Sequence, residues 1–187
     1  MKSRIQARYV LPLMIFFGVF MSNAHAQGRF QNSLSLSGGA YAASGFGTNP
    51  YVGVRYNYFL PGGQYFVEAS FGFSSLQSDV LETVSRSQLF DSNDLFSYEF
   101  VFAYDPTPIG YLPYMLGGVA GLNQGGQTSF AGVLGLGKRM PLGTFLGSNQ
   151  IGFRYDVRDQ IFSQRLNNAE PFLAHNMVFT LGLQFYF

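Results

Sequence analysis

Apolar and polar residues alternate with a period of two along much of the chain. At the C-terminus, for example, Met177, Phe179 and Leu181 alternate with Val178 and Thr180. The same alternation runs through residues 33–40, 52–58, 64–74, 96–104, 150–158 and 177–187. Successive side chains of an extended strand point to opposite faces, so each stretch is predicted to be a β-strand with one apolar face.

The first apolar segment has a different character. Lys2, Arg4 and Arg8 precede an apolar run over 10–21, and Ala24-His25-Ala26 fits a small-x-small cleavage site. We expect residues 1–26 to be a secretory signal peptide that is removed, leaving residues 27–187 as one β-barrel domain. The alternative, an anchoring helix, needs roughly 20 apolar residues. No later stretch is apolar over such a length.

Two further strands are predicted at 112–122 and 130–140, because turn residues separate them at 123–128. Both are glycine-rich, and their pattern leaves open which side chains share a face. The total is then eight, an even number, as closure of an antiparallel membrane barrel requires. The 161 residues that follow residue 26 (187 − 26) give roughly twenty for each strand and its connection, enough for membrane-spanning strands of about 9–11 residues.

The connections between these strands are predicted to differ in length at the two ends of the barrel. With the N-terminus in the periplasm, the inner turns would be 61–63, 105–110 and 141–148. The outer loops would be 43–50, 75–93, 123–128 and 159–174. The longest connections fall on the outer side, as is typical of outer-membrane barrels.

The polar face of the strands favours a membrane barrel over a soluble one. Charged residues make up only 11% of the chain, and the polar positions carry mostly Ser, Gly, Asn and Gln. Six charged residues share the polar positions of their strands: Arg55, Glu68, Glu99, Arg154, Asp156 and Arg158. Charges inside a narrow lumen are tolerated only when they are paired. The pattern therefore predicts an all-β, eight-stranded antiparallel up-and-down transmembrane β-barrel, with these six residues as a charge network in its lumen.

One ion pair within this network can be predicted from the first inner turn. A two-residue loop at Pro61-Gly62 would place Arg55 directly opposite Glu68. A loop at Gly62-Gly63 would shift the register by two and leave the pair diagonal, with both side chains still on one face. Either register predicts an Arg55–Glu68 ion pair.

Candidate catalytic and metal-binding residues are sparse. His175, near Ser163 and Glu170, lacks the His-x-Ser spacing of barrels that deacylate lipid A, and we expect a rim residue rather than a catalytic one. The acidic residues Asp79, Glu82, Asp91 and Asp94 match no calcium loop. After residue 26 the net charge is 8 − 10 = −2, and no cysteine is present. We therefore expect no catalytic, cofactor or metal site and no nucleic-acid binding.

A resemblance supports the same architecture. The ending FTLGLQFYF (179–187), with HNM (175–177) and YDVRDQIF (155–162), is similar to the outer-membrane β-barrel domain family of small OmpA/OmpX-like, eight-stranded proteins. The resemblance implies location in the outer membrane, surrounded by lipid and lipopolysaccharide. It also implies that Phe185 and Phe187 form a C-terminal signal for the barrel-assembly machinery, with periplasmic chaperones as partners during biogenesis.

The function expected from these features is structural or surface-interacting, in a monomeric, non-catalytic protein. Two alternatives stay open: a lipid A-modifying enzyme that uses the rim, and a narrow channel or ligand-binding barrel. General porin activity is not expected, because eight strands leave an interior that side chains just fill.

Deleting Phe187 is predicted to impair assembly, because this residue ends the last apolar alternation. Its ring would serve both as a lipid contact and as a recognition feature. The level of the protein in outer-membrane fractions should fall and periplasmic degradation should rise. Unchanged levels at strong expression would contradict the assignment.

Overall fold

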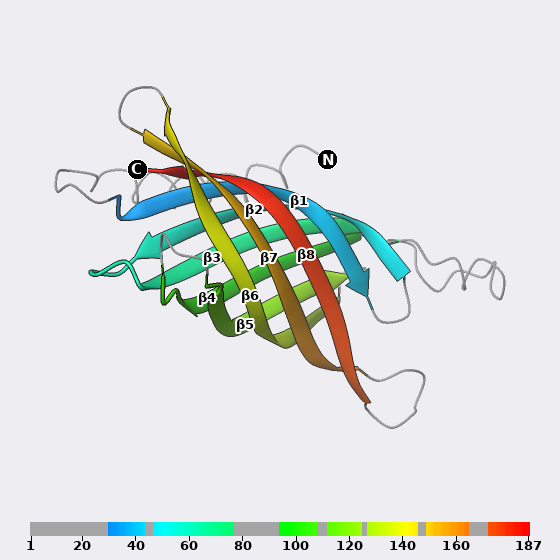
Figure 1. Cartoon of the computed structure of the whole chain (residues 1–187). Coiled ribbons are helices and arrows are strands. Elements are labelled where there is room, and N and C mark those ends of the chain that lie inside the picture. Colours follow the sequence, from blue (N-terminus) through cyan, green and yellow to red (C-terminus); the bar gives the residue numbers. More distant parts are fainter. Residues whose placement is uncertain are drawn as a thin grey trace, which may run out of the picture. The chain divides into compact units, whose positions relative to one another are not determined.

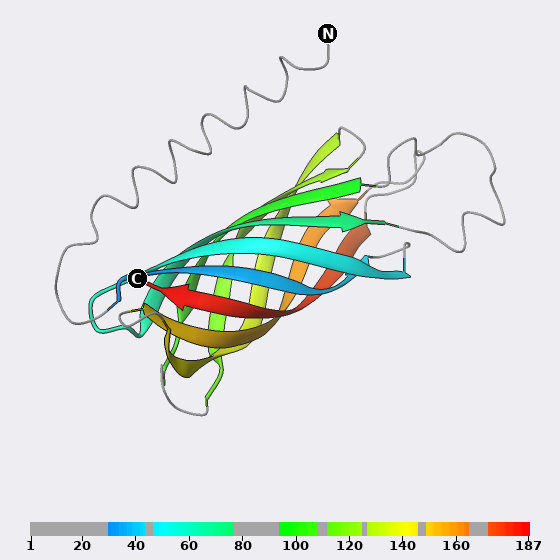
Figure 2. The same ribbon diagram turned by 90° about the horizontal axis from the view of Figure 1, so that it is seen from above.

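The structure, a computed structural model, describes residues 30–43, 47–76, 94–107, 112–124, 127–145, 149–164 and 172–187. These residues form the strands β1 (Asn32–Ala43), β2 (Gly47–Phe59), β3 (Tyr65–Ser75), β4 (Asp94–Tyr104), β5 (Tyr114–Gln124), β6 (Gln127–Phe145), β7 (Asn149–Gln164) and β8 (Phe172–Tyr186). Each strand pairs antiparallel with its neighbours in the sequence, and β1 pairs with β8 to close the barrel (Figures 1 and 2). The predicted eight-stranded up-and-down barrel is confirmed.

The predicted signal peptide, residues 1–26, lies outside the described residues. Within the described part of the chain, no helix has the length and apolar character needed to cross a membrane.

The apolar face of the barrel points outward. On β4, Phe96 and Phe100 are more than half exposed, whereas Ser97 and Glu99 between them are buried. The same division holds on β2, where Val52 and Val54 are exposed and Arg55 and Asn57 are buried. Such an arrangement suits a lipid surrounding, because exposed large apolar side chains on every strand would be costly in water.

The two glycine-rich strands acquire definite faces in the structure. On β5, Leu116 and Ala120 point inward and Val119 outward. On β6, Val133 points inward and Leu134 outward. Apart from Arg139, their buried inward residues are mostly small or apolar, which is why no alternation of polarity marked these strands in the sequence.

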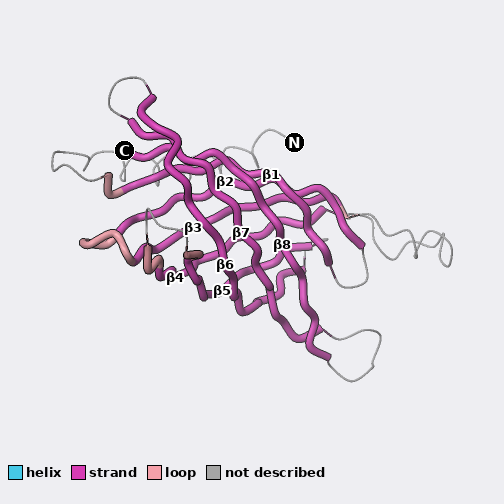
Figure 3. Tube along the Cα trace, in the orientation of Figure 1, coloured by secondary structure: helices cyan, strands magenta, loops and turns pink. Residues whose placement is uncertain are grey.

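The strands are longer than predicted, and several expected loops are therefore wrong in extent. The expected loop at 43–50 shrinks because β2 already begins at Gly47. The loop at 159–174 is shorter than expected, because Asp159–Gln164 continues β7. This stretch pairs with Phe172–Met177 of β8. The turn at 141–148 is largely strand, with a bulge between Pro141 and Gly143 that interrupts the ladder. Figure 3 shows these strand extensions. Backbone pairing continues past the apolar belt, where polar side chains no longer distinguish strand from loop.

The hairpin of β2 and β3 adopts the second of the two predicted registers. Asn57 lies opposite Glu68, and Arg55 lies opposite Ser70. Gly62 and Gly63 both have positive φ angles, 95° and 74°, which suit glycine in the tight connection that follows Leu60. Arg55 and Glu68 are therefore diagonal neighbours on the inner face.

Inward glycines leave room for large inward side chains. A Cβ atom at Gly72 would overlap the ring of Tyr51. A Cβ atom at Gly137 would lie 2.5 Å from Asp156 Cβ and closer still to the Tyr114 hydroxyl. At both positions the inward side chain of a neighbouring strand occupies the space that a larger residue would need.

Gly137→Ala is accordingly predicted to destabilise the barrel by about 1–3 kcal/mol, the typical cost of overpacking a filled interior. Urea unfolding of the protein folded into lipid vesicles would measure the change. Gly132→Ala is the matched control, because a Cβ atom at Gly132 would have Ile161 O, 3.9 Å away, as its nearest neighbour from another part of the chain. Equal stability of the two variants would contradict this account of the packing.

Candidate functional site

Strand β7 carries a row of polar residues along the inside of the barrel. Arg154, Asp156, Arg158 and Gln160 occupy alternate positions and are all buried. Asp156 lies between the two arginines: its Oδ2 is 3.2 Å from Arg154 Nε, and its Oδ1 is 2.7 Å from Arg158 Nε. The period of two in an extended strand brings the three charges together on one face.

Ion pairs then join this row to strands across the lumen. Arg158 pairs with Glu99 of β4 and, at 2.5 Å, with Glu68 of β3. Arg154 Nη1 lies 2.5 Å from the other oxygen of Glu68. Arg55 of β2 pairs with Asp156 and donates to Thr180 Oγ1 at 2.8 Å. All six charged residues predicted from the sequence therefore lie in one buried network, in which three guanidinium groups face three carboxylates.

The predicted Arg55–Glu68 ion pair is wrong in its partners, although both residues point inward. Among the described residues, Arg55 pairs with Asp156, and Glu68 pairs with Arg154 and Arg158. A guanidinium on a long side chain reaches the opposite wall of a narrow barrel, where Asp156 offers a closer partner than the diagonal neighbour.

Neutral hydrogen-bonding groups complete the network. Arg154 Nε donates to the Tyr114 hydroxyl at 2.8 Å, and Arg154 Nη1 donates to Asn57 Oδ1 at 3.1 Å. Toward the end at which β1 finishes, Gln160 donates to Glu99 at 2.6 Å and accepts from the Tyr41 hydroxyl at 2.9 Å. These hydrogen bonds offset part of the cost of burying the charges, although Arg55 Nε and Arg154 Nη2 make none with the described residues.

A second charged unit, which the sequence analysis missed, lies at the end of the barrel where β1 begins and β8 ends, called here the terminal end. Arg139 Nη2 is 2.5 Å from Asp105 Oδ2, and both residues are buried. The guanidinium carbon of Arg139 lies 4.6 Å from the ring centroids of both Phe59 and Phe66. Cation–π contacts of this kind are strongest where water is excluded.

The sequence did contain a signal for this unit. Asp105 shares the parity of Glu99 and follows β4 directly, but it was assigned to an inner turn. Arg139 lies in the glycine-rich stretch whose faces were undetermined. With this pair, the described residues place four arginines and four carboxylates in the interior, three of each from the network plus one of each here.

The candidate catalytic and metal-binding residues considered in the sequence do not belong to the charge network. His175 is half exposed on the outward face of β8, and its Nδ1 lies 2.8 Å from Asp159 Oδ2 on β7. Asp94 is exposed at the start of β4, whereas Asp79, Glu82, Asp91 and Glu170 lie outside the described residues. Across the described ranges, no group of three or more potential metal-ligating side chains occurs.

The C-terminal residues are anchored by backbone pairing. Phe187 N donates to Asn32 O at 2.9 Å, and Asn32 N donates to Phe187 O at 3.1 Å. Phe185 pairs with Leu34 of β1 and Ile151 of β7. Both aromatic residues thus help to close the barrel, and their role as an assembly signal stays a prediction.

Comparisons with known proteins agree with this architecture. No family model and no curated protein sequence matches the chain. The N-terminal β-barrel domain of Pseudomonas aeruginosa OprF is similar over 85% of this chain and 100% of its own, with 18% identity and a TM-score of 0.51. The outer membrane protein AlkL, whose structure was determined in lipid bilayers, is similar over 88% of this chain and 94% of its own, with 14% identity and a TM-score of 0.50. At these identities the likeness shows the fold, that of small outer-membrane barrels.

The cross-lumen pairing predicts which charges are energetically coupled. Removing one partner from a buried pair typically costs about 3–5 kcal/mol, because the other charge is left uncompensated. Arg55→Met should therefore destabilise the folded barrel far more than Arg86→Met, a change in the connection between β3 and β4. Urea unfolding in lipid vesicles would measure both.

A double-mutant cycle then separates the two possible partners of Arg55. The pair Arg55→Met and Asp156→Asn should show a coupling energy of about 1–3 kcal/mol. The pair Arg55→Met and Glu68→Gln should show a smaller one. A larger coupling energy for Arg55 with Glu68 than for Arg55 with Asp156 would instead support the ion pair expected from the hairpin register.

Proposed function

We propose that this chain is a small integral outer-membrane barrel with a structural or surface-interaction role, and that its interior is closed to solutes. The observation that carries the proposal is the direction of the two faces. Apolar side chains such as Phe100 and Phe130 point outward and are exposed, while charged residues point inward and are buried. A lipid surrounding explains the outward apolar side chains, and a filled polar interior explains the inward charged ones.

The orientation follows from the ends of the barrel. The terminal end carries the compact connection between β2 and β3, which suits the periplasmic side. Aromatic residues gather on its outer surface: the Tyr65 ring lies 5.6 Å from Phe102 and 5.0 Å from Tyr104. Such rings mark the boundary between lipid and water. The opposite end, called here the loop end, would then face the exterior, where surface interactions would occur.

Closure of the lumen is supported by its successive layers. At the terminal end, Arg139 is held between Phe59 and Phe66. Next comes the charge network, and beyond it Tyr41 joins Gln160 to Asn176 by hydrogen bonds of 2.9 and 2.8 Å. An eight-stranded barrel has room for little more than its own side chains.

The same contacts support a non-catalytic role. Each guanidinium of the interior is matched by a carboxylate within the barrel, so these charges serve one another rather than a substrate. As proposed partners we retain outer-membrane lipid and lipopolysaccharide, and the barrel-assembly machinery and periplasmic chaperones during biogenesis. We propose a monomer, because the barrel has no open sheet edge for another chain to extend.

Electrophoresis and conductance test the proposal. The purified protein should require detergent or lipid, and unheated samples should migrate differently from boiled ones on gels, because the closed barrel resists unfolding by detergent. Planar bilayers containing it should show no steady single-channel conductance. A mature chain that is monomeric and soluble without detergent would refute the membrane assignment, and sustained conductance would refute the closed lumen.

A further inference from the structure

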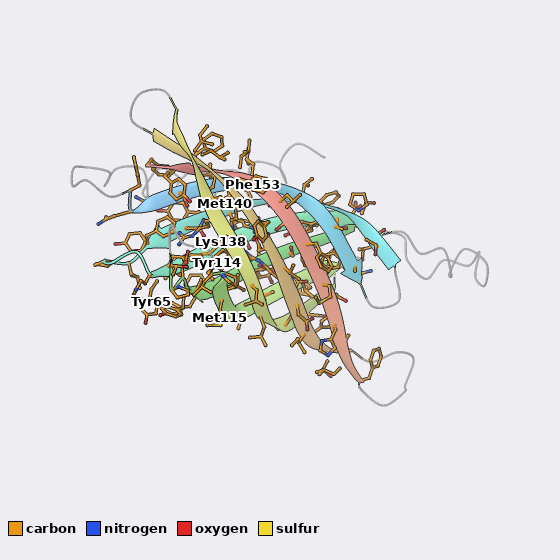
Figure 4. All side chains as sticks on the ribbon, viewed as in Figure 1. Tyr65, Tyr114, Met115, Lys138, Met140 and Phe153 are labelled. Atoms are coloured by element: carbon orange, nitrogen blue, oxygen red, sulfur yellow. The ribbon has the colours of Figure 1, made fainter. Side chains whose placement is uncertain are left out.

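Lys138 occupies an unusual place on the wall of the barrel. It belongs to the outward row of β6, between the exposed side chains of Leu136 and Met140, and lies opposite the exposed Tyr155 of β7. Yet only 5% of Lys138 is exposed. Figure 4 labels Lys138 together with Met140 and Tyr114. Gly137 pairs with Tyr114, the first residue of β5, so Lys138 faces the segment that leads into β5 at the terminal end.

Two backbone oxygens, those of Thr107 and Leu112, hold the ammonium group. Lys138 Nζ donates to Leu112 O at 2.7 Å and to Thr107 O at 2.8 Å. These two hydrogen bonds are only partly buried, and an ammonium has a third donor. The carbonyls orient the group but supply no negative charge.

Among the described residues, Lys138 differs from the other buried basic residues in having no acidic partner. Of the buried basic side chains in the described ranges, the four arginines have carboxylate partners and Lys138 has none. The chain has ten acidic residues. Four neutralise the interior arginines, and Asp159 faces His175. The others belong to the 75–94 and 165–171 stretches, which connect strands at the loop end.

We propose that Lys138 is the centre of a binding site for the phosphate of a phospholipid headgroup, in the leaflet at the terminal end of the barrel. This inference rests on the proposed membrane location. A cation held on a lipid-facing wall is costly without a counter-ion. The chain provides no carboxylate there, and a headgroup phosphate is the anion that the bilayer itself supplies at the boundary with water.

The surroundings fit a lipid rather than a free anion. Leu136, Met140 and Tyr155, the outward neighbours of Lys138 on β6 and β7, present exposed apolar surface. Acyl chains would lie along this surface while the phosphate accepts the third ammonium hydrogen bond. Thr107 O and Leu112 O keep the ammonium at this position, so little side-chain entropy is lost on binding.

Native mass spectrometry of the protein purified from membranes into a neutral detergent tests the site. Phosphatidylglycerol would be titrated in parallel with a glucosyl diacylglycerol of the same acyl chains, which lacks phosphate. The protein should retain one phosphatidylglycerol in clear preference to the glycolipid. Lys138→Met should weaken retention about tenfold, the loss expected for one charge-assisted hydrogen bond. Lys138→Arg should keep it.

Arg86→Met is the matched control, because it removes one positive charge from the 77–93 connection at the loop end. Equal retention by the wild type and Lys138→Met would overturn the proposal, as would equal binding of the two lipids to the wild type. The comparison of the two lipids uses the wild type alone, so it remains a test even if Lys138→Met fails to fold. Displacement of the lipid by millimolar inorganic phosphate would show a free-anion site instead and also overturn it. A protein that folds in bilayers but shows no preference for phosphate refutes this site alone, whereas one that never inserts refutes the membrane assignment.

Discussion

An arginine that points into an eight-stranded barrel has no bulk water to solvate its charge, so the other strands must supply the compensating carboxylates. Here this requirement links strands that share no backbone ladder. Arg158 of β7 reaches Glu68 of β3 and Glu99 of β4, and Arg55 of β2 reaches Asp156. The backbone pairing fixes each strand against its neighbours, whereas the ion pairs fix opposite walls against each other. The cross-section of the barrel therefore depends on electrical neutrality inside it.

The sequence predicted the faces of the strands wherever lipid and lumen imposed opposite demands. Six strands alternate between apolar outward and polar inward residues, and the structure agrees for each. The prediction stopped at two physical limits. Beyond the apolar belt, as at Asp159–Gln164, each face carries both polar and apolar residues, so strand pairing there leaves no alternation in the sequence. On β5 and β6, inward residues such as Ala120 and Val133 are not polar, so neither face could be distinguished from the other.

The site was predicted as a set of residues but not as a set of contacts. Which side of a strand a residue occupies depends only on its parity, and parity is local. Which carboxylate an arginine meets across the lumen depends on strand tilt and stagger, which arise only when the sheet closes. The hairpin register placed Arg55 and Glu68 on one face correctly and still gave the wrong ion pair. Asp105 was missed because an aspartate after a strand resembles an ordinary turn residue.

The glycine-rich wall and the charged wall are complementary consequences of one limited volume. A Cβ atom at Gly135 would lie 2.7 Å from Val157 O and 3.2 Å from Arg158 Cγ, so the arginine occupies space that a larger residue on β6 would need. Gly137 leaves the same kind of room for Tyr114 and Asp156. Asp156 and Arg158 of β7 thus depend on the glycines that lie opposite them on β6, and these glycines are held in part by the groups that fill their space. Substitutions on these two strands should therefore be tolerated in compensating pairs rather than singly.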